Sequence, residues 1–362
     1  MNPPPGRRRI RVLAVDDSAV MRGILRMVFD RSPGIEVVAT AANGADGLAD
    51  FDRLQPDLVL LDIEMPQMNG LDALSAIRRR NRRVPVIMCS TLTHRGAHIT
   101  LDALSRGATD YVTKPVAQSG VRAGVETLAR ELLPRIFALF ANPPAAVAAS
   151  PAASPIPLSV AASPRVVVIG VSTGGPAALE KLLPALPESF PLPILIVQHM
   201  PQLFTRLLAE RLNSLCSLRV REAVEDERVE PGTAIIARGD WHMELTRDFR
   251  LSLNQNALEN FCRPSVDPLF RSAAQAAPGR VLGVVLTGMG SDGLAGARAI
   301  RASGGSVLVQ DASTSVIWGM PGAVAGAGLA NRTLPLDALA NEILRYAQIS
   351  SPAAKPAEAL AV

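Results

Sequence analysis

The stretch Val166-Val167-Val168-Ile169-Gly170-Val171-Ser172-Thr173-Gly174-Gly175-Pro176 joins an apolar run to a serine that stands between glycines. An apolar run followed by glycines and a proline predicts a buried strand, a tight turn and the start of a helix. Such a turn holds a serine hydroxyl above a parallel sheet, and the helix N-terminus offers N–H groups to a developing oxyanion. A phosphate-binding glycine turn fits the same residues, so this stretch alone indicates either a nucleophile or a phosphate site.

Strand and helix patterns alternate along both halves of the chain. Strands are expected at residues 11–15, 36–39, 58–61, 84–88, 111–112, 166–169, 194–197, 281–286 and 306–309. Helical patterns lie between them, for instance at residues 20–29, 71–79, 204–212 and 294–302. This alternation predicts parallel sheets with helices on both faces. The expected fold class is α/β, with two doubly wound parallel-sheet domains.

A segment rich in proline and alanine divides the two halves. Residues 142–164 contain six prolines among mostly small residues, so they are expected to form an extended tether without a core. The predicted boundaries are a first domain at 8–125, a linker at 126–163 that is Pro/Ala-rich from 142, a second domain at 164–347 and a flexible tail at 348–362.

Composition excludes several classes of protein. The chain has 362 residues and is 48% hydrophobic, but no apolar run reaches the ~18 residues of a membrane span. No signal peptide is evident, so a cytoplasmic location without membrane insertion is expected. Three separated cysteines suggest neither a disulfide framework nor a zinc site. The net charge of +4 is spread out with few aromatics, which argues against a nucleic-acid partner.

Acidic residues and one rare lysine follow the predicted strands of the first half. In a parallel sheet, ligands bind at the carboxyl ends of the strands, so these side chains should share one pocket. Clustered carboxylates favour a hard divalent cation, which predicts Mg²⁺, and Asp62 could then accept a phosphoryl group. A structural ion-pair cluster is the alternative. The residues expected in the pocket are Asp16, Asp17, Asp62, Ser90 and Lys114.

Residues 8–120 resemble the flavodoxin-like receiver domain of bacterial response regulators. The matching motifs are Val15-Asp16-Asp17-Ser18, Leu61-Asp62-Ile63-Glu64-Met65-Pro66 with Gly70, and Tyr111-Val112-Thr113-Lys114-Pro115. The resemblance implies Asp62 as the phosphorylated residue. It implies that Mg²⁺ is held by Asp17, Asp62 and the backbone carbonyl of Glu64, with Asp16 in support. Ser90 and Tyr111 would be the switch residues, beside Lys114.

The second half supplies partners for Ser172. His199 follows the strand at 194–197 and is expected to act as general base beside the serine. Asp292 follows the strand at 281–286 and could orient the histidine, although an aspartate there could also be a helix N-cap. Asp311 is the rival carboxylate. The glycines around Met289 could present backbone N–H groups as an oxyanion hole.

Residues 164–347 resemble the catalytic domain of the chemotaxis protein-glutamate methylesterases, the CheB family. The matching motifs are 169–176, Gln198-His199-Met200-Pro201, Arg263-Pro264-Ser265-Val266-Asp267, 286–293 and Gly319-Met320-Pro321. The resemblance implies a Ser172, His199, Asp292 triad with the Met289 N–H in the oxyanion hole and no cofactor for the esterase. Arg238 stands where the family usually has proline.

The resemblance implies a serine hydrolase, activated by phosphorylation, that demethylates glutamyl esters and deamidates glutamines on chemoreceptors during sensory adaptation. A chemotaxis histidine kinase would be the phosphodonor. The alternative is a non-enzymatic response regulator whose second half is a binding module. DNA-binding output domains are usually short and helical, whereas this half is rich in strands, which favours the enzyme.

Overall fold

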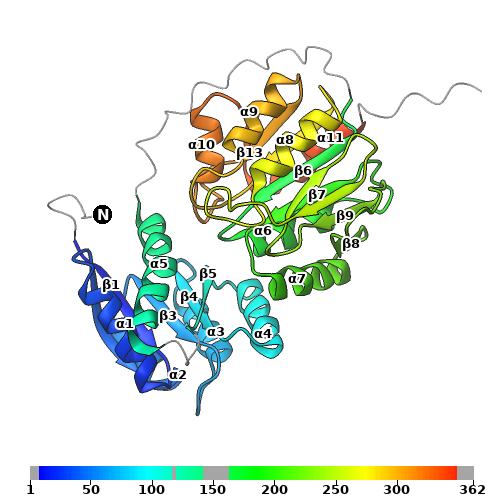
Figure 1. The fold of residues 1–362 in the computed structure, drawn as a ribbon. Helices are drawn as coiled ribbons and strands as arrows, with labels where there is room; N and C mark the ends of the chain where they lie inside the picture. Colours follow the sequence, from blue (N-terminus) through cyan, green and yellow to red (C-terminus); the bar gives the residue numbers. More distant parts are fainter. Residues whose placement is uncertain (1–7, 116–119, 142–162, 349–362) are drawn as a thin grey trace, which may run out of the picture. The chain divides into compact units, whose positions relative to one another are not determined.

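The computed structural model describes residues 8–115, 120–141 and 163–348 and forms two compact units, residues 1–142 and 143–362 (Figure 1). Each unit contains a parallel sheet, so the predicted α/β class with two parallel-sheet domains is confirmed. Among the described residues, no helix is both long and apolar enough to span a membrane.

The first unit is built on a five-stranded parallel sheet with the order β2-β1-β3-β4-β5. Its strands are rich in Val, Ile and Leu because both faces of the sheet are covered. The order places β1 and β3 side by side where the connections reverse direction, which is where ligands bind in such sheets. The strands are β1 (Ile10–Val15), β2 (Ile35–Ala41), β3 (Leu58–Asp62), β4 (Val86–Ser90) and β5 (Asp110–Thr113).

The helices of the first unit start at polar caps. In α1 to α4 a side-chain oxygen of the N-cap accepts a hydrogen bond from a first-turn N–H, which satisfies a donor that the helix leaves unpaired. These caps are Ser18, Asn43, Asn69 and Thr93. The helices are α1 (Ala19–Asp30), α2 (Gly44–Leu54), α3 (Gly70–Arg80), α4 (His94–Ser105) and α5 (Gly120–Phe140).

Helix α5 corrects one predicted boundary. The sequence predicts a linker from residue 126, but α5 continues to Phe140 and contains Pro134. Leu128, Leu132 and Ile136 are buried in the same core as α1 and the strands of the first sheet. Burial of this apolar stripe stabilises the helix within the first unit, so residues 126–140 are not linker. The predicted tether at 142–164 lies almost wholly outside the described residues, as does the predicted tail beyond Gln348.

The second unit is built on a seven-stranded parallel sheet with the order β14-β13-β12-β6-β7-β9-β8. The first strand, β6, lies between β7 and β12, so the turns that follow these three strands meet at one edge. A separate antiparallel pair joins β10 and β11. The strands are β6 (Val166–Val171), β7 (Ile194–Gln198), β8 (Arg219–Glu222), β9 (Thr233–Ile236), β10 (His242–Leu245), β11 (Leu251–Asn254), β12 (Val281–Val285), β13 (Ser306–Gln310) and β14 (Arg332–Leu334).

Helices cover both faces of this sheet (Figure 1). Helix α8 packs with α9 and β10 over one side, where Leu269 and Phe270 enter a buried hydrophobic cluster of the second unit. Helix α6 packs against a second group of helices, α7 and α11. The helices are α6 (Gly175–Leu182), the short 3₁₀ helix η2 (Leu183–Ala185), α7 (Gln202–Leu215), α8 (Val266–Ala276), α9 (Leu294–Ala302), α10 (Met320–Gly326) and α11 (Leu336–Gln348).

Candidate functional site

Ser172 stands directly after β6, on the turn that leads into α6. The turn needs glycine, because Gly174 has a φ of 79° and a Cβ there would lie 2.6 Å from a methyl of Val316. The Ser172 amide donates to the carbonyl of Thr287 at 3.0 Å, so this turn lies against the loop after β12. The serine is half-buried and lies at the carboxyl edge of the sheet.

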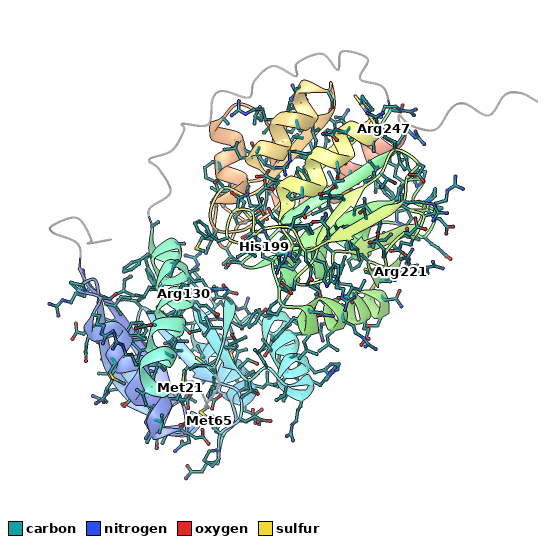
Figure 2. All side chains as sticks on the ribbon, viewed as in Figure 1. Met21, Met65, Arg130, His199, Arg221 and Arg247 are labelled. Atoms are coloured by element: carbon teal, nitrogen blue, oxygen red, sulfur yellow. The ribbon has the colours of Figure 1, made fainter. Side chains whose placement is uncertain are left out.

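His199 follows β7 at the same edge, and Figure 2 labels its side chain. Its amide donates to the carbonyl of Val171, the residue before Ser172, at 3.1 Å. Nε2 of the ring lies 2.8 Å from Oδ2 of Asp292, which comes from the loop between β12 and α9. The structure thus brings His199 and Asp292 together next to Ser172. In the described residues no hydrogen bond joins Ser172 Oγ to the ring.

The two rival residues are engaged elsewhere. Asp311 accepts hydrogen bonds from Ser313 Oγ and from the amide and hydroxyl of Thr314, so it closes its own turn. His242 is buried, with Nε2 3.1 Å from the carbonyl of Ala257 and Nδ1 accepting from the Ser265 amide at 3.2 Å. Both ring nitrogens of His242 serve the local structure, so geometry favours His199 as base and Asp292 as its partner.

Asp292 is a buried carboxylate surrounded by donors. Oδ2 accepts a hydrogen bond from Nε2 of His199 and another, at 2.7 Å, from the amide of Val266. Val266 is the first residue of α8. Oδ1 accepts from Ser265 Oγ, Asn260 Nδ2 and the amides of Asp267 and Gly293. Burial works against the charge, but the hydrogen bonds outweigh it and lower the pKa of Asp292. The N-terminus of α8 and these donors keep the carboxylate ionised, so Nε2 of His199 carries a proton.

The second nitrogen of His199 faces a cysteine that had no predicted role. Sγ of Cys262 lies 3.6 Å from Nδ1. Burial opposes a charge on the ring, but the hydrogen bonds to Asp292 and Cys262 outweigh it and raise the pKa of His199 to about 10. Cys262 directly precedes the Arg263-Pro264-Ser265-Val266-Asp267 motif. That motif supports the family resemblance, but it does not predict a contact between Cys262 and His199.

Met289 lies in the loop that packs against Ser172. A Cβ added to the preceding Gly288 would lie 2.8 Å from Cβ of Ser172, which measures how closely the two backbones approach. Thr287 ties the loops together, since its hydroxyl donates to the Thr173 carbonyl at 2.9 Å. Among residues 163–348 the Met289 amide donates no hydrogen bond, so it is available to a negative charge beside the serine.

The first unit gathers its acidic residues at the carboxyl ends of β1 and β3. Oxygen atoms of Asp16, Asp17 and Asp62 lie within 4.8 Å of one another. Nζ of Lys114 lies 2.9 Å from Oδ2 of Asp16 and 2.8 Å from Oδ1 of Asp62. The Ile63 amide also donates to Oδ1 of Asp62, so both contacts leave Oδ2 of that residue for other partners.

The electrostatics of this cluster favour a cation. Burial, followed by repulsion from Asp16, raises the pKa of Asp62 to about 6, although Lys114 counteracts both. Burial also raises the pKa of Asp16, although Lys114 counteracts this effect. A hard cation with oxygen ligands would neutralise the repulsion among the three carboxylates, so the donor set fits Mg²⁺.

The remaining predicted receiver residues lie on neighbouring strands. Ser90 ends β4 and is fully buried, and its hydroxyl accepts from Thr100 Oγ1 at 2.7 Å. Tyr111, on β5, is buried. The carboxylate of Glu64 forms an exposed ion pair with Arg95 at 3.2 Å, so a metal contact by Glu64 would use its backbone carbonyl as predicted.

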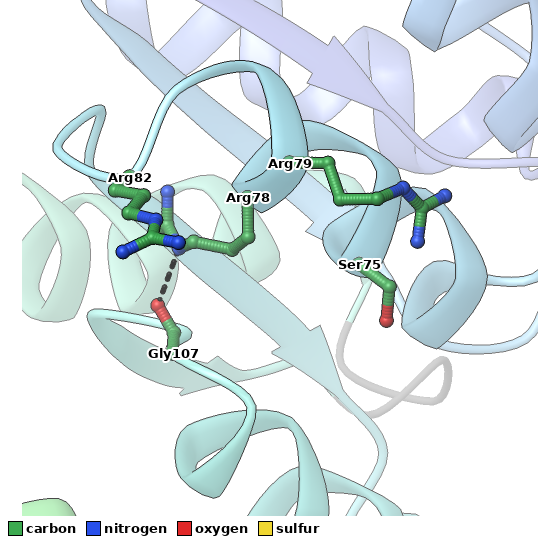
Figure 3. Close-up of a pocket in the computed structure, with 5 residues that line it drawn as sticks. All are labelled: Ser75, Arg78, Arg79, Arg82 and Gly107. Carbon is green, nitrogen blue, oxygen red and sulfur yellow. Dashed lines mark hydrogen bonds between the residues drawn. The ribbon is translucent and has the colours of Figure 1, made fainter.

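A hollow lined by arginines lies at the C-terminal end of α3 (Figure 3). Arg78 donates from Nε to the Gly107 carbonyl at 2.8 Å and from Nη1 to the Val84 carbonyl at 2.7 Å. Arg78, one of the basic residues in the run 78–83, therefore has a structural role. Its guanidinium joins the end of α3 to the loops before β4 and β5. The other lining residues are Ser75, Arg79 and Arg82.

Comparisons with known proteins cover both units. A family model described as CheB methylesterase matches residues 167–343, and one described as response regulator receiver domain matches residues 12–126. A protein-glutamate methylesterase/protein-glutamine glutaminase from Nocardioides sp. is 50% identical over 97% of this chain and 99% of its own length. A relative of the same name from Trichodesmium erythraeum is 47% identical over 93% of this chain and 99% of its own length. The solved CheB methylesterase catalytic domain of Thermotoga maritima is 41% identical over 51% of this chain and 98% of its own, with a TM-score of 0.49.

Proposed function

The chain belongs to the CheB family of protein-glutamate methylesterases with a receiver domain, and on this premise we propose that Ser172, His199 and Asp292 hydrolyse γ-glutamyl methyl esters of chemoreceptors. The observation that carries the proposal is the shared sheet edge. Ser172 follows β6, His199 follows the adjacent β7, and Asp292 holds Nε2 of His199 at 2.8 Å. A nucleophile, a base and an orienting carboxylate are what acyl transfer to serine requires.

Acylation starts with attack of the Ser172 hydroxyl oxygen on the ester carbonyl carbon. The hydroxyl proton passes to Nδ1 of His199, because Nε2 already carries the proton bound to Asp292. The oxyanion of the tetrahedral intermediate is stabilised by the Met289 amide. When the intermediate collapses, the ester C–O bond breaks and the proton on Nδ1 goes to the leaving oxygen, which releases methanol.

Deacylation repeats these steps with water as the nucleophile. His199 takes a proton from water, the hydroxide oxygen attacks the acyl carbon, and the proton returns to the Ser172 oxygen as glutamate is released. A glutamine side chain follows the same route with ammonia as the leaving group, which is deamidation. No metal or cofactor enters these steps.

The first unit regulates the hydrolysis through phosphorylation of Asp62. Oδ2 is the oxygen that would accept the phosphoryl group, because Lys114 and the Ile63 amide both bind Oδ1. Asp16, Asp17, Asp62 and the Glu64 carbonyl would hold Mg²⁺, which neutralises charge on the phosphoryl group during transfer. Ser90 and Tyr111 would respond to the phosphoryl group as switch residues.

The proposed partners are methyl-accepting chemoreceptors as substrate and a chemotaxis histidine kinase as phosphodonor. We place the protein in the cytoplasm with these partners. The proposed catalytic domain spans residues 164–347, and the receiver extends through α5.

Methanol release from methylated receptor membranes tests the proposal. The wild-type protein should release methanol, and acetyl phosphate with Mg²⁺ should increase the rate. Ser172→Ala should release none above background, whereas Asp62→Asn should keep a basal rate that acetyl phosphate does not change. Methanol release by the Ser172→Ala protein at the wild-type rate would refute the proposed nucleophile. Equal responses of wild type and Asp62→Asn to acetyl phosphate would refute the proposed control.

A further inference from the structure

Both ring nitrogens of His199 are engaged in the structure, and neither contact is with Ser172. Nε2 binds Asp292 at 2.8 Å, and Nδ1 lies 3.6 Å from Sγ of Cys262. The carboxylate accepts the Nε2 proton, so in the neutral ring Nδ1 is an acceptor and the thiol S–H is its donor. Nδ1 is also the nitrogen that has to receive the Ser172 proton, so Cys262 occupies the position that the reaction uses.

The turn that carries Cys262 is firmly fixed. The Cys262 amide donates to the Glu259 carbonyl at 2.9 Å, and the Glu259 amide donates back to the Cys262 carbonyl at 3.2 Å. The two central residues, Asn260 and Phe261, have φ values of 52° and 62°. This is the backbone of a tight hairpin turn that usually contains glycine, and Phe261 adopts it although its side chain is 97% exposed.

Two further contacts hold this turn to α8. The carboxylate of Glu259 binds the guanidinium of Arg271 through both oxygens, one of them at 2.7 Å. Asn260 donates to Oδ2 of Asp267 at 2.9 Å and to Oδ1 of Asp292 at 2.8 Å. Through Asn260, the turn connects the carboxylate of Asp292 to Cys262. Asp292 and Cys262 are therefore held in fixed positions on the two nitrogens of the His199 ring.

We propose that Cys262 is a positioning residue of the esterase: its thiol holds Nδ1 of the neutral His199 ring toward Ser172 before substrate binds, and yields this nitrogen to the serine hydroxyl when substrate binds. The inference rests on the proposed roles of Ser172 and His199. A single bond to Asp292 leaves the ring free to rotate about that bond, whereas a second donor on the opposite nitrogen fixes the plane of the ring.

Protons balance without any change at sulfur. The thiol keeps its proton while its hydrogen bond to Nδ1 breaks. The Ser172 oxygen forms its bond to the acyl carbon as the hydroxyl proton moves to Nδ1. After that proton has left with methanol, Nδ1 is again an acceptor, and the S–H···N bond can form again.

The test compares Cys262→Ala, Cys262→Ser and wild type in methanol release across pH, at saturating receptor substrate. Cys216→Ala is the matched control, because it removes another half-buried thiol, at the end of α7. Loss of one hydrogen bond to the base should lower the plateau kcat of Cys262→Ala about threefold to tenfold. Cys262→Ser should regain most of kcat, because a hydroxyl also donates to Nδ1.

Several results would overturn the proposal. These are an unchanged or increased plateau kcat of Cys262→Ala, a serine variant as slow as the alanine variant, or the same losses in Cys216→Ala. A measurement on the wild type needs no variant to fold. Nitrogen-15 spectra of the neutral His199 ring should show a protonated Nε2 and an unprotonated Nδ1, and the opposite tautomer would overturn the proposal. Failure of the proposed function would instead appear as full activity of Ser172→Ala.

Discussion

Replacing Asp292 with asparagine changes one oxygen into an NH₂ group and should invert the tautomer of His199. Oδ1 of Asp292 accepts four hydrogen bonds, and Oδ2 accepts two, from His199 Nε2 and the Val266 amide. The amide oxygen of asparagine should therefore take the Oδ1 position, and its NH₂ group should point at Nε2. Nε2 must then act as acceptor, so the ring proton moves to Nδ1, which can no longer take the Ser172 proton.

The expected magnitude follows from these contacts. In serine proteases the same change leaves the geometry intact and lowers kcat by about 10⁴, because the histidine has the wrong tautomer. We expect a loss of about 10³–10⁴ here. Stability should fall by about 3 kcal/mol, because hydrogen bonds to a charged group are weakened and the new NH₂ group faces the Val266 N–H. For a unit of this size that lowers the melting temperature by roughly 6–12 °C.

Methanol release at 25 °C, where the variant should remain folded, separates the two effects. Circular dichroism gives the melting temperature, and nitrogen-15 spectra of His199 report which ring nitrogen is protonated. Asp311→Asn is the control, because that carboxylate only closes its own turn and lies outside the proposed triad. An Asp292→Asn protein with a kcat within tenfold of wild type would refute the role of Asp292, as would a normal tautomer in an inactive protein.

Three other predictions concern the nucleophile, the base and the receiver. Ser172→Ala should lower kcat by on the order of 10⁶ without lowering the melting temperature, and a loss under 10³ in methanol release would contradict this. Because the pKa of His199 is raised to about 10, the wild-type rate should increase with pH from 7 toward 10, and a flat profile would contradict the base. Asp62→Asn should not be labelled by acetyl phosphate with Mg²⁺. The folded-state pKa of Asp62 is raised from 3.8 to about 6, so its ionisation costs stability in full above pH 6, and this cost fades as the pH falls from 6 toward 3.8. Asp62→Asn should therefore stabilise the Mg²⁺-free receiver by about 3 kcal/mol at pH 7.5 and less at pH 4.5, measured by urea unfolding. Equal stabilisation at both pH values would contradict the raised pKa.

The parallel sheets and their strand-end residues could be predicted because one rule governs both. A buried strand is read from its run of Val, Ile and Leu, and the carboxyl ends of parallel strands share an edge. Asp16, Asp62 and Lys114 lie together for this reason, as do Ser172 and His199. The predicted strand at 84–88 instead runs from Val86 to Ser90, because pairing with β3 and β5 fixes the register.

The surroundings of His199 could not be predicted, because they depend on contacts between distant segments. Cys262 lies in a turn with no glycine, so its sequence gives no turn signal. The turn is set by Glu259 and Asn260, which bind α8 and Asp292 across the fold. The length of α5 could not be predicted for a related reason. Leu128, Leu132 and Ile136 are buried against the core of the first unit, and this packing between distant segments extends the helix beyond residue 126.

The central claim is that Ser172 forms the acyl-enzyme with His199 as base. It is tested most directly by treating the protein with a serine-reactive fluorophosphonate and locating the adduct by peptide mass spectrometry. The account predicts one adduct, on Ser172, that forms much more slowly in His199→Ala and is absent in Ser172→Ala. An adduct on Cys262 or on any other residue, or labelling of Ser172 at the wild-type rate without His199, would contradict it.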